Sequence, residues 1–156
     1  MRKASYFTRR THKPDYQYQR TDITRFINYL MQDGHKATAE KVFYGAMDRI
    51  KEATKEDPVK TFEKALEQAM PLVEVTSRRV GGANYQIPRD IRPERKFFLA
   101  THWIIAAARG GKGKPMAEKL ANELILAAKG EGSAIKKKHD MHRMAEANRA
   151  FASLLR

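Results

Sequence analysis

Residues 21–50 read TDITRFINYLMQDGHKATAEKVFYGAMDRI, and this stretch decides the fold class. A short turn beginning at Gly34 divides it into two parts. In each part, apolar residues recur at the three- and four-residue spacing of an amphipathic helix: Ile23, Phe26, Ile27, Leu30 and Met31, then Ala39, Val42, Phe43, Ala46, Met47 and Ile50. The stretch therefore predicts two core-facing helices, joined closely enough to pack as an antiparallel pair.

Further helical stripes follow, and proline or glycine marks their ends. Pro58, Pro93 and Pro115 occupy first-turn positions, where a missing backbone N–H has little effect on a helix. Gly110 and Gly130 close two of these stripes. The predicted helices cover roughly residues 58–70, 93–110, 115–129 and 133–154.

A different pattern separates the first two of these helices. From Val73 onward, residues of alternating character indicate a strand, Gly81-Gly82 forms a turn, and an extended stretch returns through Ile87. This predicts a β-hairpin at about residues 73–88. The predicted fold class is mainly α, with about six helices and a protruding β-hairpin.

The charge of the chain predicts a polyanionic partner. It carries 31 Lys and Arg against 18 Asp and Glu, which gives a formal net charge of +13 and a pI near 10.1. Self-repulsion on this scale opposes compactness, so we expect a nucleic acid, an anionic membrane surface or an acidic protein to neutralise it. No run of about 18 apolar residues predicts a membrane span, and no apolar segment follows the basic start as in a signal peptide. The absence of cysteine excludes disulfides, thiolate metal sites and cysteine nucleophiles.

The cations concentrate in a few places that suit RNA. Residues 1–20 are predicted to form a basic RNA-binding arm, with tyrosines able to stack on bases, and its cations are Arg2, Lys3, Arg9, Arg10, Lys13 and Arg20. Residues 21–156 are predicted to form a single helical domain, with basic residues at His35, Lys36, Arg92, Arg95, Arg109, Lys112 and Lys114. Duplex RNA hides its base edges, so proteins grip its phosphates, 2′-hydroxyls and loops, and arms and hairpins can reach these.

No group of residues predicts a catalytic site, a metal site, a cofactor or a small-molecule substrate. His139 and His142 lie three apart on a predicted helix, but a zinc site takes three or four protein ligands, so we interpret both as facing solvent or RNA. The loop at residues 110–114 lacks the G-x-x-x-x-G-K-S/T spacing of a phosphate-binding loop. An RNA-modifying or RNA-cleaving enzyme is therefore disfavoured. A general basic architectural nucleic-acid-binding protein stays open as an alternative.

Several longer motifs resemble one family. Residues 71–88, PLVEVTSRRVGGANYQIP, with Ile91-Arg92-Pro93 after them, are similar to the hairpin of the small-subunit ribosomal protein S-seven family of bacterial type. Residues 116–124, MAEKLANEL, and 142–152, HRMAEANRAFA, resemble the last helices of that family, and residues 26–34 resemble its first. The motifs stand in the family's order and cover about residues 21–152.

The resemblance implies a helical bundle with a protruding hairpin, a structural constituent of the small ribosomal subunit in the bacterial cytoplasm. It implies binding to the 3′ major domain of 16S-type rRNA early in assembly of the subunit head, beside neighbouring ribosomal proteins. It also implies a place near the exit site for tRNA and mRNA. By this resemblance the rRNA-facing residues include His35, Lys36 and the loop from Arg109 to Met116. Those near the exit site are Arg78, Arg79, Tyr85, Gln86, Lys136, Arg143 and Arg149.

Overall fold

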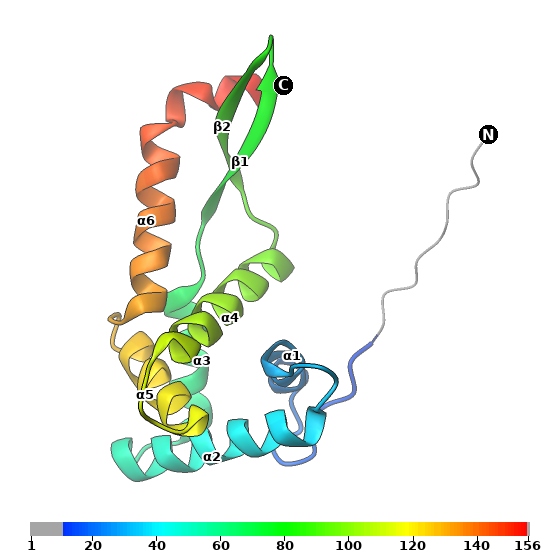
Figure 1. The fold of residues 1–156 in the computed structure, drawn as a ribbon, viewed down its shortest axis with the longest axis vertical. Coiled ribbons are helices and arrows are strands. Elements are labelled where there is room, and N and C mark those ends of the chain that lie inside the picture. Colours follow the sequence, from blue (N-terminus) through cyan, green and yellow to red (C-terminus); the bar gives the residue numbers. More distant parts are fainter. Residues whose placement is uncertain (1–10, 156) are drawn as a thin grey trace, which may run out of the picture.

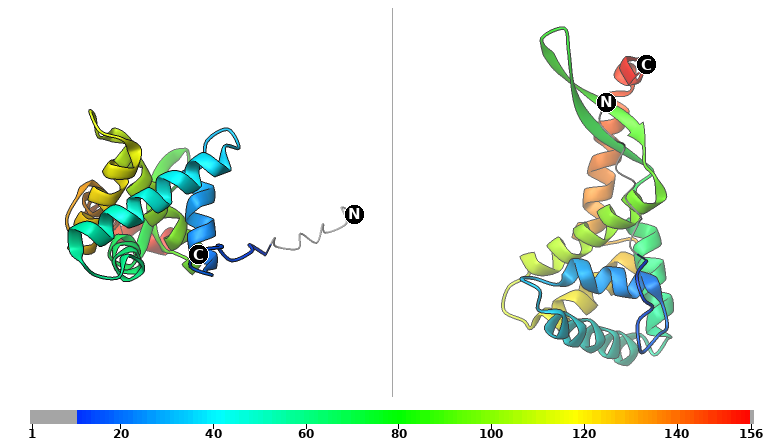
Figure 2. Two further views of the ribbon diagram at one scale, coloured as in Figure 1. Left: turned by 90° about the horizontal axis from the view of Figure 1, so that it is seen from below. Right: turned by 90° about the vertical axis from the view of Figure 1, so that its right-hand side faces the viewer.

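The structure, a computed structural model, describes residues 11–155 and is mainly helical, which confirms the predicted fold class (Figure 1). Helices α1 to α5 form a body, and the hairpin and α6 extend from it side by side (Figures 1 and 2). Within the described residues, the elements are α1 (Thr21–Leu30), α2 (Lys36–Thr54), α3 (Pro58–Ala69), β1 (Val73–Val80), β2 (Ala83–Asp90), α4 (Pro93–Gly110), α5 (Met116–Ala128), α6 (Ser133–Ala147) and the 3-10 helix η1 (Arg149–Leu155).

The first two helices bury the predicted apolar stripes but do not lie antiparallel. Ile23 and Phe26 of α1 and Phe43 of α2 are fully buried, so the prediction of two core-facing helices is confirmed. In Figure 1, α1 is viewed nearly along its axis while α2 runs across the picture, so the two helices cross steeply. Asp33 (φ 50°) and Gly34 (φ 78°) both adopt the left-handed backbone conformation, which redirects the chain within the turn. The predicted antiparallel pairing was therefore wrong.

The predicted helix starts at Pro58 and Pro93 are confirmed, and the start predicted at Pro115 falls one residue later. Pro58 and Pro93 are the first residues of α3 and α4, and Pro115 directly precedes α5. Asp57 caps α3, because its side chain accepts a hydrogen bond from the backbone N–H of Val59 at 3.0 Å.

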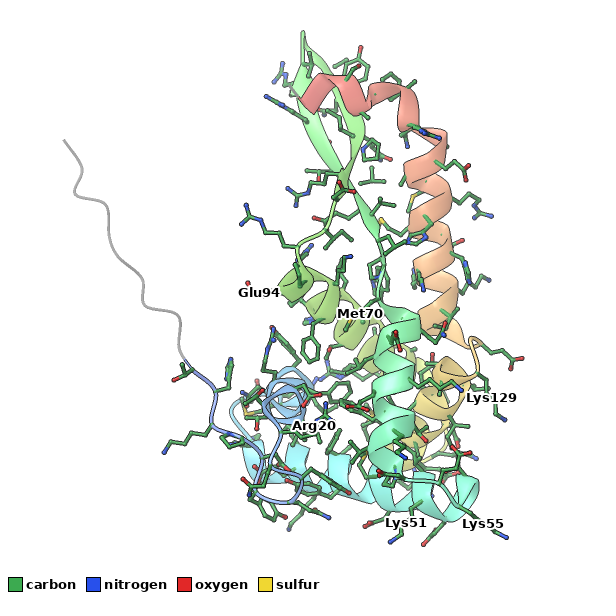
Figure 3. All side chains as sticks on the ribbon, turned by 180° about the vertical axis from the view of Figure 1, so that it is seen from behind. Arg20, Lys51, Lys55, Met70, Glu94 and Lys129 are labelled. Carbon is green, nitrogen blue, oxygen red and sulfur yellow. The ribbon has the colours of Figure 1, made fainter. Side chains whose placement is uncertain are left out.

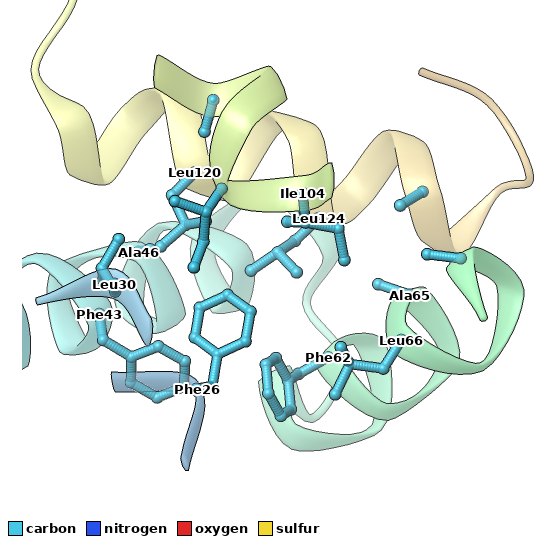
Figure 4. Close-up of a cluster of buried hydrophobic side chains, with 14 of the residues drawn as sticks. Phe26, Leu30, Phe43, Ala46, Phe62, Ala65, Leu66, Ile104, Leu120 and Leu124 are labelled. Carbon is cyan, nitrogen blue, oxygen red and sulfur yellow. The ribbon is translucent and has the colours of Figure 1, made fainter. Parts of the chain in front are cut away.

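Three aromatic rings lie in the core where α1, α2 and α3 meet. Phe26, Phe43 and Phe62 have ring centroids 5.2 to 5.6 Å apart, and all three are fully buried. Ile104 of α4 and aliphatic side chains of α5 cover them (Figure 4). Burying one such ring stabilises the fold by about 1.5–3 kcal/mol, so this cluster holds the helical body together.

The hairpin forms as predicted, with a two-residue turn. Gly81 (φ 57°) and Gly82 (φ 93°) both have positive φ, as a type I′ turn requires, and glycine adopts this conformation without steric penalty. The antiparallel register pairs Glu74 with Arg89 and Thr76 with Ile87. Glu74 and Ile87 are buried while their sequence neighbours are more exposed, so this face of the hairpin packs inward.

The last predicted helix, to about residue 154, is divided into two elements. α6 ends at Ala147, and the side chain of Asn148 donates a hydrogen bond to the Met144 carbonyl at 2.8 Å. Such side-chain bonds to the backbone compete with helix propagation. The chain then turns as η1 toward the hairpin, where the Phe151 ring lies 5.2 Å from the Tyr85 ring. A single continuous helix was therefore a wrong prediction.

Part of the predicted arm packs on the helical body. Asp15 is 5% exposed and accepts hydrogen bonds from the N–H groups of Gln17 and Tyr18 at 3.1 and 3.0 Å. Its other oxygen accepts a hydrogen bond from the Tyr44 hydroxyl of α2. Residues 11–20 are thus anchored to α2. The remaining predicted cations of the arm, Arg2, Lys3, Arg9 and Arg10, lie outside the described residues.

Candidate nucleic-acid interface

The turn between α1 and α2 and the ends of α4 and α5 enclose a hollow of about 470 Å³, which we call the turn hollow. Its lining includes His35, Arg109 and Met116, three of the predicted rRNA-binding residues, together with Lys119. The guanidinium of Arg109 donates a hydrogen bond to the Leu30 carbonyl at 3.0 Å, which ties the end of α4 to the end of α1. The fold therefore brings together predicted residues from distant parts of the sequence.

A second hollow of about 530 Å³, the arm hollow, is lined by residues 11–16 together with side chains of α1 and α2. Lys13 and Lys36, both predicted to bind rRNA, line it along with Asn28 and Tyr16. Tyr16 is 70% exposed, and its ring packs edge-on against Tyr44 with centroids 5.2 Å apart. Cations beside an exposed ring and an amide are the side chains that grip RNA phosphates and bases.

The loop between α4 and α5 presents two of the predicted lysines. Lys112 is exposed, and Lys114 forms an ion pair with Glu118 at 2.6 Å. Arg49 of α2 also pairs with Glu118, at 3.1 Å. The hydrogen bond from Lys114, outweighing desolvation, holds the pKa of Glu118 below its ordinary value. Glu118 thus places two cations beside the loop.

The base of the hairpin and the start of α4 enclose a third hollow, of about 510 Å³, which we call the hairpin hollow. It is lined by Glu74, Arg89, Asp90, Arg92 and Arg95. Burial alone would raise the pKa of Glu74, but hydrogen bonds from Arg89 and Arg95 outweigh burial and lower it. Arg92 and Arg95 were predicted to bind rRNA, and the structure places them side by side here.

The residues predicted near the exit site lie on two faces of the hairpin. Arg78 pairs across the strands with Tyr85, on the face that meets η1. Arg79 and Gln86 belong to the opposite face, because successive side chains of a strand alternate. Arg78, Arg79 and Gln86 are exposed, and Tyr85 is half-buried.

The predicted cations of α6 and η1 lie on elements that pack against the hairpin. Lys136, Arg143 and Arg149 are exposed, and Arg143 forms an ion pair with Asp140 at 2.9 Å. Their exposure agrees with the prediction of a basic helix. Their proximity to tRNA and mRNA remains a prediction.

His142 is half-buried and makes a contact within the chain, which our interpretation from the sequence missed. Its Nε2 accepts a hydrogen bond from the Leu72 backbone N–H at 3.0 Å, where the chain enters β1. Burial, followed by the charges of Lys138 and His139, lowers the pKa of His142 and favours the neutral, accepting form. Lys138 donates to the Gln68 carbonyl at 2.6 Å, and burial lowers its pKa. Both side chains fasten α6 to the body.

Arg20 also makes its contacts within the chain. Its guanidinium pairs with Asp22 at 2.8 Å and with Glu63 of α3. The hydrogen bonds that Arg20 donates to these two carboxylates raise its pKa. Figure 3 places Arg20 beside α1, where it connects the start of that helix to α3.

Two cations of the hollows were not among the predicted site residues. Arg89 lies in the basic run after the hairpin turn, and the high density of positive charge in that run could have identified it as a site residue. Lys119 lies on α5 among ordinary helical charges, and its spacing gives no signal in the sequence.

The described residues offer no cluster for metal chemistry. Across residues 11–155, no group of three or more His, Asp or Glu side chains is arranged to hold a metal ion. In the same part of the chain, every helix is too short or too polar to cross a membrane.

Comparison with known proteins shows that the chain is similar to ribosomal proteins. The family model described as "Ribosomal protein S7p/S5e" matches residues 1–149. The chain is 51% identical over 139 residues to the "Small ribosomal subunit protein uS7" of a Chelativorans species, and 53% identical to that of Magnetococcus marinus. It is 52% identical over 138 residues to that of Pseudomonas aeruginosa. These alignments cover 88–89% of this chain and 88–89% of each relative.

The chain therefore belongs to the S7p/S5e family of ribosomal proteins and is of the bacterial type. The resemblance stated from the hairpin and the last helices is confirmed, since the matched region contains both.

Proposed function

We propose that the chain is a structural constituent of the small ribosomal subunit in the bacterial cytoplasm and that it binds the 3′ major domain of 16S-type rRNA. The names of its relatives, small ribosomal subunit proteins, support the first part. The turn hollow carries the second part, because His35, Arg109 and Met116 come from three separate elements to line one depression.

The proposed mechanism is architectural. Arg109 and Lys119 bring positive charge to the turn hollow, and its wall includes the apolar side chains of Leu30 and Val42. Phosphates can pair with the cations while a ribose or base covers the apolar wall. Each neutralised phosphate releases counterions, so affinity falls as salt rises. RNA strands that repel one another can then meet on the protein, and no bond is made or broken.

We further propose that the chain nucleates assembly of the subunit head and lies near the exit site for tRNA and mRNA. The arrangement in Figure 1 supports two separate RNA-binding regions, one on the helical body and one on the hairpin. The turn and arm hollows lie on the helical body, whereas Arg78 and Arg79 lie near the far end of the hairpin. The body can hold rRNA while the hairpin reaches toward a second RNA.

Reconstitution of the subunit head tests this proposal. Protein-free 16S-type rRNA is mixed with the other head proteins, with and without the full chain, and the bound proteins are measured after sedimentation. We expect the other proteins to join efficiently only when the chain is present. Equal joining in both mixtures would contradict a nucleating role.

A further inference from the structure

The hairpin hollow is organised by one buried carboxylate. Glu74 is 5% exposed and lies opposite Arg89 in the hairpin register. Its Oε1 accepts a hydrogen bond from Nε of Arg89 at 2.9 Å, and its Oε2 accepts one from Nε of Arg95 at 3.2 Å. Glu74 therefore fixes two guanidinium groups that belong to different elements, β2 and α4.

Both arginines keep donors that Glu74 does not use. Arg89 reaches Glu74 through Nε and Nη2, which leaves Nη1, and Arg95 reaches it through Nε alone. The Arg95 guanidinium also lies 4.9 Å from the centre of the Phe98 ring, which limits its orientations.

Arg92 completes the lining of the hollow. It directly precedes α4, its side chain is exposed, and it forms no ion pair with any residue in the described part of the chain. A third guanidinium therefore borders the hollow without an ion pair to any described carboxylate.

We propose that the hairpin hollow binds one phosphodiester group of rRNA, with Arg92 as a contact and with Glu74 positioning Arg89 and Arg95 for the same phosphate. The proposal rests on the proposed rRNA binding. The three guanidinium groups and the two carboxylates of Glu74 and Asp90 leave a net charge of +1, which matches the single negative charge of a phosphodiester. Guanidinium groups held in place lose less conformational freedom on binding.

An acidic protein is the other anion that could enter, because guanidinium groups also pair with carboxylates. The position of the hollow favours RNA. It lies at the hairpin exit of a chain with a net charge of +13, and acidic protein surfaces are a weaker match than RNA to charge on this scale.

The proposal predicts that Glu74→Gln weakens RNA binding, although the substitution removes a negative charge. Removing a negative charge from an RNA-binding surface ordinarily strengthens binding. The amide, however, offers one acceptor oxygen instead of two and cannot hold both guanidinium groups. We therefore expect Glu74→Gln to bind the 16S-type 3′ major-domain fragment about fivefold to tenfold more weakly. Its binding to an unrelated RNA of equal length is expected to be unchanged or stronger.

Asp90→Asn is the matched control. Asp90 lines the same hollow and carries the same charge, but it pairs with no arginine in the described part of the chain. We expect this variant to bind both RNAs equally well or more tightly. Arg92→Gln is expected to weaken binding to the fragment about tenfold and to lower the slope of log affinity against log salt by about 0.7–0.9.

The experiment measures the affinity of the full chain and each variant for both RNAs over a salt series, with thermal unfolding to verify folding. If Glu74→Gln is unfolded, Arg95→Lys replaces it, because lysine keeps the charge and loses the guanidinium fork; about fivefold weaker binding is expected. If Glu74→Gln behaves like Asp90→Asn, or if the replacing Arg95→Lys binds like the parent chain, the positioning role is overturned.

The outcomes separate this inference from the proposed function. A parent chain that does not distinguish the two RNAs would contradict the proposed function itself. A selective parent chain whose Arg92→Gln variant binds as the parent does would overturn only the phosphate site. Stronger competition by polyglutamate than by unrelated RNA, lost in Arg92→Gln, would assign the hollow to an acidic protein and overturn the proposal.

Discussion

Glu123→Ala tests how the basic helix α6 is held in place. Glu123 of α5 is 8% exposed, and its Oε1 accepts a hydrogen bond from the Ala134 N–H in the first turn of α6 at 2.9 Å. Gly132, the N-cap residue of α6, makes no side-chain capping hydrogen bond, so Glu123 acts as the cap from another helix. Glu123→Ala removes this hydrogen bond and also removes a carboxylate from the N-terminus of a helix, where negative charge is favourable. Together these losses lower the free energy of unfolding by about 2 kcal/mol.

For a chain of 156 residues, this loss lowers the melting temperature by about 4–8 °C. Thermal unfolding followed by circular dichroism measures the shift. Glu131→Ala removes the same charge from an exposed position nearby and is the control. Equal melting temperatures for the two variants would refute the capping role.

Gly132→Ala extends the same test. Gly132 has φ 96°, and a Cβ there would lie 2.9 Å from Oε1 of Glu123. We expect the substitution to cost about 1–3 kcal/mol in the parent chain because both the backbone and the contact are strained. In the Glu123→Ala background the contact with Glu123 is gone, while the backbone strain and a contact with Cβ of Leu126 at 3.3 Å remain, so the cost falls. Additive effects in this double-mutant cycle would contradict the geometry.

Three further predictions concern other contacts. Protonation of His142 removes the nitrogen that accepts the hydrogen bond from Leu72. The pKa of His142 is lowered in the folded chain, so the unfolded chain takes up the proton first as the pH falls. The stability that this hydrogen bond contributes is therefore complete above about pH 6.5 and is lost as the pH falls below that value. Thermal unfolding between pH 5 and 7.5 in the parent chain and in His142→Gln measures this. Tyr44→Phe leaves one oxygen of buried Asp15 without its donor and costs about 1–3 kcal/mol in urea unfolding. Arg78→Glu combined with Arg79→Glu impairs tRNA binding at the exit site of reconstituted subunits, while the melting temperature changes little because both side chains are exposed.

Each of these has a contradicting result. A parent chain and His142→Gln with the same pH dependence would show that this histidine does not titrate at the junction. Unchanged urea stability of Tyr44→Phe would show that Asp15 finds another donor. A large fall in melting temperature for the double arginine variant would show that these side chains pack structurally.

The helices and the hairpin could be predicted because their signals are local. The stripe from Ile23 to Leu30 and the prolines at 58 and 93 set helix faces and starts within a few residues. Gly81 and Gly82 likewise specify a two-residue turn. The steep crossing of α1 and α2 depends on packing among several helices, so the spacing of apolar residues does not contain it.

The missed features depend on partners far away in the sequence. His142 meets the Leu72 backbone 70 residues earlier, and the aromatic contact of Phe151 with Tyr85 accompanies the change of direction after α6. The positive charge of Arg20 is visible in the sequence, whereas its pairing with Glu63 is visible only in the fold. Charge therefore predicts that a surface binds RNA, and the structure shows which cations already have partners.

Binding of the purified full chain to a 16S-type 3′ major-domain fragment, compared with unrelated RNA of equal length and with duplex DNA over a salt series, tests the central claim most directly. We predict selective binding to the fragment that persists as salt rises, with a slope of log affinity against log salt that corresponds to about six to ten neutralised phosphates. Equal binding to all three nucleic acids would contradict specific rRNA recognition and would favour a general basic architectural nucleic-acid-binding protein.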